Sequence, residues 1–278
     1  MLTSKTFTFQ NKNLSFLDST LEKNGTIIFT HANGYSAHCY SYYLELLSEG
    51  YRVIGLDFSG HGSSELIYDF KNWNHYRDQI LSLIEFLSLK SAIGIGHSMG
   101  GACLLKASRS LPNFFQKLIL FDPTVLSMKI SLYRFFFDLP IAKSAEKRRS
   151  RFKSKDQIAK VFRKFPAFSN WKEVFYDSYI TSCIRVLDSG EAELVCDPKL
   201  EAKNFRSQGF FAPLEFHSIP TETHIIIPEK YEVCSPEMGK KIISKNTKST
   251  LEIVPNITHF FPFENPELIQ TVLDRLIP

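Results

Sequence analysis

Hydrophobic and polar residues follow two alternating rhythms along residues 1–125. Short continuous apolar runs that end in glycine-rich or polar turns are typical of strands buried in a sheet. Between these runs, apolar residues recur every three or four positions, which predicts amphipathic helices. The predicted strands are Thr6–Gln10, Asn13–Leu17, Thr26–Thr30, Arg52–Leu56, Ser91–Gly96 and Lys117–Phe121, and the predicted helices are Cys39–Leu47, Trp73–Leu89 and Gly100–Ser110. This alternation predicts an α/β fold whose mostly parallel sheet is flanked by helices.

The rhythm changes between residues 126 and 211, where no strand–helix alternation is visible. Aromatic segments with helical spacing occur there instead: Leu132–Phe137, Ile158–Phe165 and Trp171–Ile180. The alternation then returns with strands at His224–Ile227 and Thr250–Val254 and with helices from Pro236 and over Pro266–Leu276. We therefore expect one core, made of residues 1–125 and 212–278, with residues 126–211 inserted as a helical cap over the sheet.

One turn of this core carries a candidate nucleophile. The segment Gly96-His-Ser-Met-Gly100 fits the pattern G-x-S-x-G and lies between a predicted strand and a predicted helix. Small flanking residues let the chain make a tight, strained turn, on which the hydroxyl of Ser98 stands exposed. The helix that follows directs its first amide N–H groups at the same point. The pattern alone is short, so its strand–helix context is what supports it.

Other polar turns follow the predicted strands in the same way. His31-Ala-Asn-Gly34 follows one strand, Asp57-Phe-Ser-Gly-His-Gly-Ser-Ser64 follows another, and His259 follows the last one. In open α/β sheets, ligands bind beyond the carboxyl ends of the strands. We therefore expect these turns and Ser98 to meet at one edge of the sheet.

These four motifs, in this order and spacing, resemble those of the alpha/beta-hydrolase superfamily, and the resemblance covers nearly the whole chain outside the expected cap. It implies that Ser98 is the nucleophile and that His259 is its general base. It also implies an oxyanion hole made by the backbone N–H groups of Met99 and Asn33, and no cofactor or metal. Ala32 stands where relatives most often have glycine.

The acid of the catalytic triad departs from the family pattern. Relatives commonly carry it after the strand that precedes the histidine loop, and Tyr231 occupies that slot here. Glu232, one residue later, is the acid that we expect. Glu229 is an alternative nearer the strand, and Asp122 is the stronger alternative because some branches take the acid from its position.

The resemblance implies a serine hydrolase that cleaves an ester or related acyl substrate through an acyl-enzyme intermediate. A serine at position 98 argues against the branches that use an aspartate nucleophile, the dehalogenases and epoxide hydrolases. Two alternatives stay open: a hydrolase or lyase that breaks a carbon–carbon bond on the same fold, and a non-catalytic scaffold that binds a ligand.

Composition indicates which partners and which cellular location to expect. The 278 residues carry a formal net charge of only +4, which gives no reason to expect a nucleic-acid partner. The 25 Phe and 11 Tyr suggest a large core and an apolar pocket, and hence a small-molecule substrate with an apolar part. Five scattered cysteines without a C-x-x-C pair are typical of free thiols. No signal-peptide pattern and no long apolar run occurs, so we expect a cytoplasmic protein without integral membrane association.

Overall fold

The computed structural model describes residues 1–20, 24–209, 212–230 and 233–277. Within them, eight strands form one sheet in the order β1-β2-β4-β3-β5-β6-β10-β11. Their bounds are β1 Thr3–Phe9, β2 Lys12–Asp18, β3 Thr26–Thr30, β4 Arg52–Leu56, β5 Ala92–His97, β6 Phe115–Phe121, β10 Glu222–Pro228 and β11 Thr250–Val254. Every pair from β4 to β11 is parallel, whereas β1 and β2 add an antiparallel edge. The predicted fold class is confirmed.

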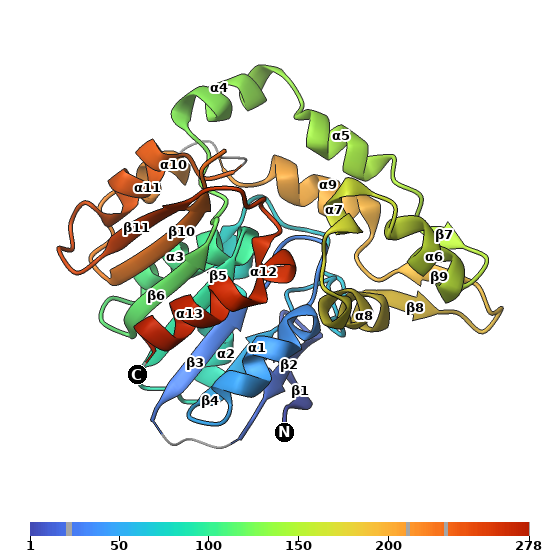
Figure 1. Ribbon diagram of the computed structural model, residues 1–278, viewed down its shortest axis with the longest axis horizontal. Coiled ribbons are helices and arrows are strands. Elements are labelled where there is room, and N and C mark those ends of the chain that lie inside the picture. The colour runs from blue at the N-terminus through green and yellow to red at the C-terminus, as the bar shows by residue number, and fades with distance from the viewer. Residues whose placement is uncertain (21–23, 210–211, 231–232, 278) are drawn as a thin grey trace.

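Helices cover both faces of this sheet. They are η1 Ala37–Tyr40, α1 Ser41–Leu47, α2 Asn74–Phe86, α3 Met99–Ser110, α10 Ala212–Glu215, α11 Pro236–Ile243, α12 Phe261–Glu264 and α13 Pro266–Leu276. Figure 1 shows α1 and α13 in front of the sheet. Successive strand residues point to opposite faces: in β10, Ile225 and Ile227 join the core under α2, α3 and α11, while Ile226 joins the core under α1, α12 and α13. Such strands are buried on both sides, which explains their continuous apolar runs.

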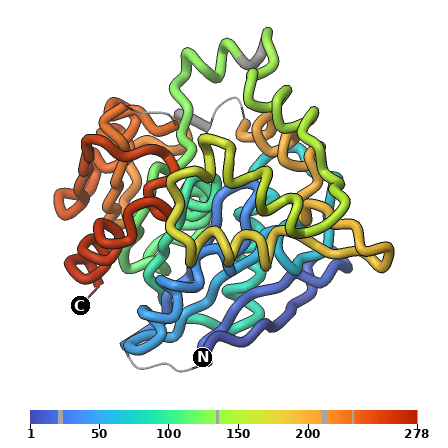
Figure 2. Tube along the Cα trace, turned by 45° about the vertical axis from the view of Figure 1, so that its right-hand side comes forward, coloured from blue at the N-terminus to red at the C-terminus, as the bar shows by residue number. Residues whose placement is uncertain are grey.

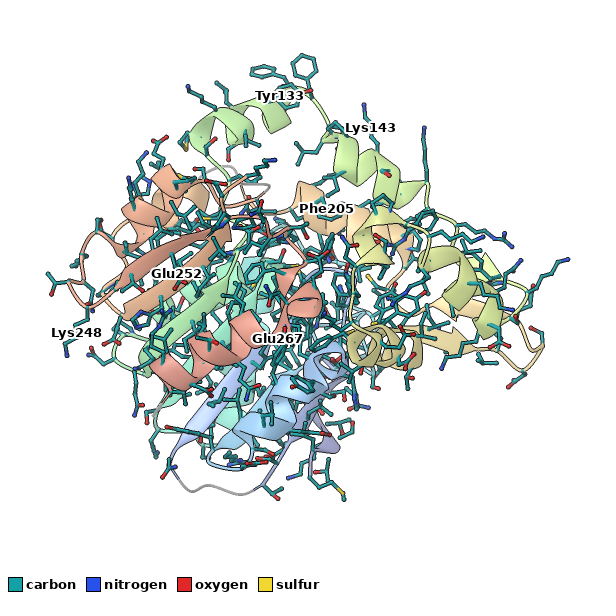
Figure 3. All side chains as sticks on the ribbon, in the orientation of Figure 1. Tyr133, Lys143, Phe205, Lys248, Glu252 and Glu267 are labelled. Atoms are coloured by element: carbon teal, nitrogen blue, oxygen red, sulfur yellow. The ribbon has the colours of Figure 1, made fainter. Side chains whose placement is uncertain are left out.

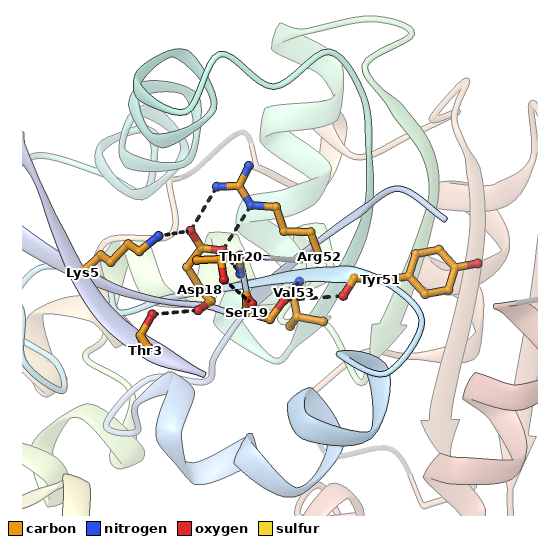
Figure 4. A network of polar contacts seen from close by, with 8 residues as sticks. All are labelled: Thr3, Lys5, Asp18, Ser19, Thr20, Tyr51, Arg52 and Val53. Carbon is orange, nitrogen blue, oxygen red and sulfur yellow. Dashed lines mark hydrogen bonds and ion pairs between the residues drawn. The ribbon is translucent and has the colours of Figure 1, made fainter. Parts of the chain in front are cut away.

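A buried carboxylate fastens the antiparallel edge to the parallel sheet (Figure 4). Asp18, at the end of β2, accepts hydrogen bonds from Arg52 Nε at 3.1 Å and Nη2 at 3.0 Å, from Lys5 Nζ at 2.8 Å and from the Thr20 N–H at 2.8 Å. Burial alone would raise the pKa of Asp18, but these donors outweigh it and lower the pKa to about 2. The edge is therefore held by an ionised carboxylate.

The segment between β6 and α10 forms a layer of its own, above and to the right of the main sheet in Figure 1. Its elements are α4 Met128–Phe136, α5 Pro140–Glu146, β7 Arg151–Phe152, α6 Lys155–Phe162, α7 Pro166–Ser169, α8 Glu173–Ser182, β8 Ile184–Val186, β9 Ala192–Leu194 and α9 Pro198–Arg206. The sequence predicts only helices here, whereas the structure adds a small antiparallel sheet in the order β7-β9-β8. Strands of two or three residues are too short to produce a readable alternation.

Most of this segment packs against the core, and its outermost part does not. The backbone N–H of Lys172 donates to the Phe263 carbonyl over 2.9 Å, and Ser36 bonds Ser182 over 2.8 Å. At the other extreme, Tyr133 on α4 and Lys143 on α5 lie at the outer rim of the molecule (Figure 3). Figure 2 shows α4 standing away from the body of the chain, whereas α5 packs on α9. Across the described ranges, no helix has the length and apolar character that crossing a membrane requires.

Candidate active site

Ser98 lies on a strained turn between β5 and α3. Its φ is 54° and its ψ is −120°, a backbone conformation that non-glycine residues rarely adopt. A Cβ at Gly96 would lie 2.7 Å from the Gly101 nitrogen, and one at Gly100 would lie 2.3 Å from the Thr30 carbonyl oxygen. Only glycine fits at either position, because the clashing atoms are backbone. The two glycines thus let the turn form, and the turn holds Ser98 at the carboxyl end of β5.

His259 and Asp122 complete a chain of hydrogen bonds with Ser98. His259 Nε2 lies 3.1 Å from Ser98 Oγ, and its Nδ1 lies 2.6 Å from Asp122 Oδ2. His259 belongs to the loop between β11 and α12, and Asp122 follows β6 directly. The Asp122 carboxylate is fully buried and also accepts the Cys234 N–H at 3.0 Å. A carboxylate at Nδ1 fixes the tautomer in which Nε2 can accept the serine proton.

The expected acid, Glu232, lies outside the described residues, as does Tyr231 in the usual slot. Glu229 is exposed after β10, and its N–H donates to the Val254 carbonyl. Among the described residues, Asp122 is the carboxylate that bonds His259. The structure therefore brings together Ser98, His259 and the alternative acid of the sequence analysis.

A buried imidazole supports His259 from behind. His97 Nε2 lies 3.0 Å from the carbonyl oxygen of His259, and its Nδ1 lies 2.7 Å from the Tyr40 hydroxyl. A carbonyl only accepts, so Nε2 carries the proton and Nδ1 accepts from Tyr40. Burial and the neighbouring His259 ring lower the pKa of His97, which keeps it neutral. His97 thus positions the backbone of His259 and does not reach the reacting atoms.

The two expected oxyanion donors, the backbone N–H groups of Met99 and Asn33, come after neighbouring strands of the sheet. Met99 begins α3, so its backbone N–H belongs to the unpaired first turn of that helix. Asn33 follows β3, which is the neighbour of β5 in the sheet. The loop before Asn33 is shaped by His31, whose Nδ1 donates to the Ala32 carbonyl at 2.7 Å because its Nε2 accepts the Phe58 N–H. Both N–H groups therefore belong to segments that meet at the carboxyl ends of β3 and β5.

The Asn33 side chain is held by helix α9 of the segment between β6 and α10. Asn33 Nδ2 donates to the Glu201 carbonyl at 3.1 Å, and its Oδ1 accepts from Asn204 Nδ2 at 2.7 Å. Asn204 is fully buried and accepts the Tyr76 hydroxyl at 2.6 Å and the Trp73 indole N–H at 3.0 Å. Sequence reasoning missed Asn204, because no local motif surrounds it. The network ties the expected oxyanion loop to two separate parts of the chain.

The loop after β4 plays a structural part. The Asp57 carboxylate accepts the N–H groups of Ala37 at 2.7 Å and Ser63 at 3.0 Å. Burial raises its pKa to about 6, although both hydrogen bonds act in the opposite direction. Gly62 packs so closely on this carboxylate that a Cβ there would lie 2.1 Å from it. The D-x-x-G-x-G loop therefore folds around Asp57 and supports the segment that follows Asn33.

Aromatic side chains crowd the space near His259. Trp171, from the segment between β6 and α10, stacks on Phe263 with ring centroids 3.9 Å apart. Tyr35 contacts both rings at 5.6 Å, and Phe260 lies beside Trp171 at 6.2 Å. Ser98 keeps 8% of its surface exposed and the His259 side chain 12%. Ser98 and His259 thus lie in a nearly closed setting with aromatic rings close by.

A large polar cleft of about 1230 Å³ lies elsewhere, between the Asp57 loop and the small sheet. Its walls include Ser63, Asp177, Glu193 and Asp197, and none of its lining residues is Ser98, His259 or Asp122. We place the candidate active site by the hydrogen-bonded constellation, because chemistry requires the reacting groups and not the largest volume. Within the described ranges, no group of three or more His, Cys, Asp or Glu side chains is arranged to hold a metal ion.

Comparison with known proteins agrees with the geometry. The model of the alpha/beta hydrolase family matches residues 27–269 of the chain. The chain belongs to the alpha/beta hydrolase family. At that level it is a hydrolase, and its substrate class is a small molecule. The match runs from β3 to α13 and therefore includes Ser98, Asp122 and His259.

Three known proteins resemble this hydrolase over different shares of its length. It is 40% identical to the bifunctional esterase/perhydrolase DCH of Acinetobacter calcoaceticus over 88 residues, which are 32% of this chain and only 29% of that protein. It is 24% identical to the uncharacterized hydrolase YugF of Bacillus subtilis (strain 168) over 265 residues, 88% of this chain and 86% of that protein. The crystal structure of E-2-(acetamidomethylene)succinate hydrolase aligns with a TM-score of 0.80 at 17% identity, covering 100% of both chains. At that identity the likeness shows the fold alone.

Proposed function

We propose that this hydrolase cleaves an ester or related acyl compound through an acyl-enzyme formed on Ser98. Ser98 Oγ attacks the acyl carbon while His259 Nε2 takes its proton, and His259 then returns that proton to the leaving group. Water attacks the acyl-enzyme by the same route and frees Ser98. The observation that carries the proposal is the continuous hydrogen-bond chain from Ser98 through His259 to a buried carboxylate.

The acid in this proposal is Asp122 and not Glu232. A 2.6 Å hydrogen bond from Nδ1 to a fully buried carboxylate supports this assignment. The negative charge of Asp122 stabilises the imidazolium that forms when His259 is protonated. The additional N–H from Cys234 keeps the carboxylate oriented.

The oxyanion of each tetrahedral intermediate would be held by the backbone N–H groups of Met99 and Asn33. Fixed donors of this kind stabilise a transition state by about 3–4 kcal/mol each. The side-chain bonds of Asn33 to α9 support a rigid donor, because they fix the loop before any substrate arrives. No cofactor takes part in this chemistry.

The segment 126–211 would act as a cap that selects the substrate. Trp171 brings an aromatic face to the loop that carries His259, and Asn204 reaches the oxyanion loop. A wall of this composition favours a substrate with an apolar part. The esterase relative, whose match is limited to part of its length, supports an ester as the reactive group.

Hydrolysis of a short p-nitrophenyl ester tests this function. The wild-type protein should release p-nitrophenolate with saturation kinetics, and Ser98→Ala and His259→Ala should each reduce kcat by at least about 10³-fold. Ser110→Ala is a matched control, since this serine caps the far end of α3 through the Lys106 carbonyl. Equal rates for the wild type and Ser98→Ala would exclude the proposed chemistry.

A further inference from the structure

A second hydroxyl contacts the nucleophile. Thr124 Oγ1 lies 3.0 Å from Ser98 Oγ, a hydrogen-bond distance as short as that from Ser98 to His259. The backbone joins the same two residues, because the Thr124 N–H donates to the Ser98 carbonyl over 3.0 Å. Thr124 follows Asp122 by two residues, at the point where the chain leaves β6.

The donors and acceptors at this site fix the direction of the new hydrogen bond. Asp122 accepts the Nδ1 proton of His259, so Nε2 is unprotonated and must accept from Ser98. The single hydroxyl proton of Ser98 is thereby used. Consequently Thr124 is the donor of the second bond, and Ser98 Oγ is its acceptor.

The position of Thr124 is held by contacts independent of its hydroxyl. The Val125 N–H donates to the Pro123 carbonyl over 2.8 Å, which closes a tight turn centred on Thr124. Gln208, which is 1% exposed and follows α9, donates its Nε2 to the Thr124 carbonyl. Hydrogen bonds thus hold both the N–H and the carbonyl of Thr124. The backbone is fixed, so the hydroxyl is already oriented toward Ser98 before the reaction.

We infer that Thr124 is a further catalytic residue, whose hydroxyl donates to Ser98 Oγ and stabilises the charge that this oxygen carries during attack. The inference rests on the proposed function. In the step, the Ser98 proton passes to His259 Nε2, Oγ bonds the acyl carbon, and the carbonyl π pair moves to the oxyanion. Thr124 keeps its own proton throughout. Its bond also leaves the Ser98 hydrogen pointing at His259 before the substrate binds.

Two substitutions at position 124 separate this role from packing. Thr124→Val has the same shape without the hydroxyl, and Thr124→Ser restores the hydroxyl without the methyl. We expect Thr124→Val to lower kcat/KM for p-nitrophenyl acetate by about 10- to 100-fold, the loss typical of a hydrogen bond to a charged group, with little change in KM. The rate of labelling by a fluorophosphonate probe should fall by a similar factor, because that reaction also needs attack by Ser98. Thr124→Ser should recover most of both rates.

Thr223→Val is the matched control. Thr223 is fully buried near the start of β10, at the end of the sheet away from Ser98, and its hydroxyl donates to the Thr221 carbonyl at 2.8 Å. It should leave both rates unchanged. If Thr124→Val does not fold, Thr124→Cys takes its place, because a thiol of serine-like shape is a weak donor and should be slower than Thr124→Ser.

The inference would be overturned by folded Thr124→Val with wild-type rates, or by Thr124→Ser as slow as Thr124→Val. Equal rates for Thr124→Ser and Thr124→Cys would do the same. The proposed function fails in a different way, since the wild type itself would then show neither ester turnover nor labelling at Ser98.

Discussion

His259 and Asp122, 137 residues apart in the sequence, are joined by a 2.6 Å hydrogen bond inside the protein. The two residues meet because β6, β10 and β11 are successive parallel strands, so the turn after β6 and the loop after β11 lie at the same edge of the sheet. The Asp122 carboxylate is buried, and the other ring nitrogen of His259 hydrogen-bonds Ser98. In the proposed mechanism, the first proton transfer therefore runs from Ser98 to His259.

Asp122→Asn should therefore lower kcat for a p-nitrophenyl ester by about 10³- to 10⁴-fold, because an amide no longer fixes the tautomer or stabilises the imidazolium. Glu232→Gln is the comparison variant and should stay within about twofold of the wild type. Steady-state kinetics on both proteins, with thermal melts to verify folding, measures the difference. A large loss in Glu232→Gln with an active Asp122→Asn would reverse the assignment of the acid.

Gly100→Ala should destabilise the fold as well as the site. The new Cβ would lie 2.3 Å from the Thr30 carbonyl oxygen, so the backbone of α3 or β3 must shift. We expect the free energy of unfolding to fall by about 2–3 kcal/mol, and Ser98 to lose its position. Gly50→Ala is the matched control, because its Cβ would make only an ordinary 3.6 Å contact with Asn24. Urea denaturation of the two variants compares them, and equal midpoints would refute the steric argument.

Asn204→Ala tests the tie between α9 and the oxyanion loop. It leaves Asn33 Oδ1 without its 2.7 Å donor and Tyr76 without its acceptor, all in a buried setting. We expect a loss of about 1–3 kcal/mol in stability and a fall in kcat larger than any change in KM. Asn246→Ala is the control: it removes a partly buried amide outside this network, which donates to the Pro220 carbonyl and accepts the Lys248 N–H, and it should leave kcat unchanged. If kcat is unchanged in Asn204→Ala, the network does not contribute to catalysis.

The ionised carboxylate of Asp18 gives stability a defined pH dependence. Its pKa is about 2 in the folded protein and 3.8 without partners, so its contribution is complete above about pH 4 and is lost as the pH falls toward 2. The difference in unfolding free energy between the wild type and Asp18→Asn should be largest near neutral pH and should shrink between pH 4 and pH 2. Urea unfolding at several pH values measures it. A difference that stays constant over this range would contradict the assignment.

Local sequence could predict the parts of the site that lie on single turns. Ser98 was identifiable because its glycines are needed within two residues of it, where backbone atoms leave no room for a Cβ. His259 was identifiable from its loop after the last strand. The strands of the core were readable because burial on both faces makes them continuously apolar.

The long-range partners could not be predicted in this way. Asp122 reaches His259 through the order of strands in the sheet, which no pattern near Asp122 encodes. Glu232 was expected because it lies next to the slot that relatives use for the acid, and that residue lies outside the described ranges. Thr124 and Asn204 were missed for the same reason, since a threonine after Asp-Pro and an asparagine in a polar helix carry no distinctive signal. The prediction of a helical cap also missed β7, β8 and β9, which are stabilised by pairing and not by their own sequence.

The central claim is that Ser98 is a nucleophile activated by His259 and Asp122. Labelling with a fluorophosphonate probe, followed by peptide mass spectrometry, measures this most directly, because the probe reacts only with an activated serine and leaves its mass on the residue. We expect one adduct on Ser98 in the wild-type protein, strongly slowed labelling in Asp122→Asn, and none in His259→Ala or Ser98→Ala. Absence of an adduct on Ser98 in folded wild-type protein, or equal labelling of the wild type and Ser98→Ala, would contradict it.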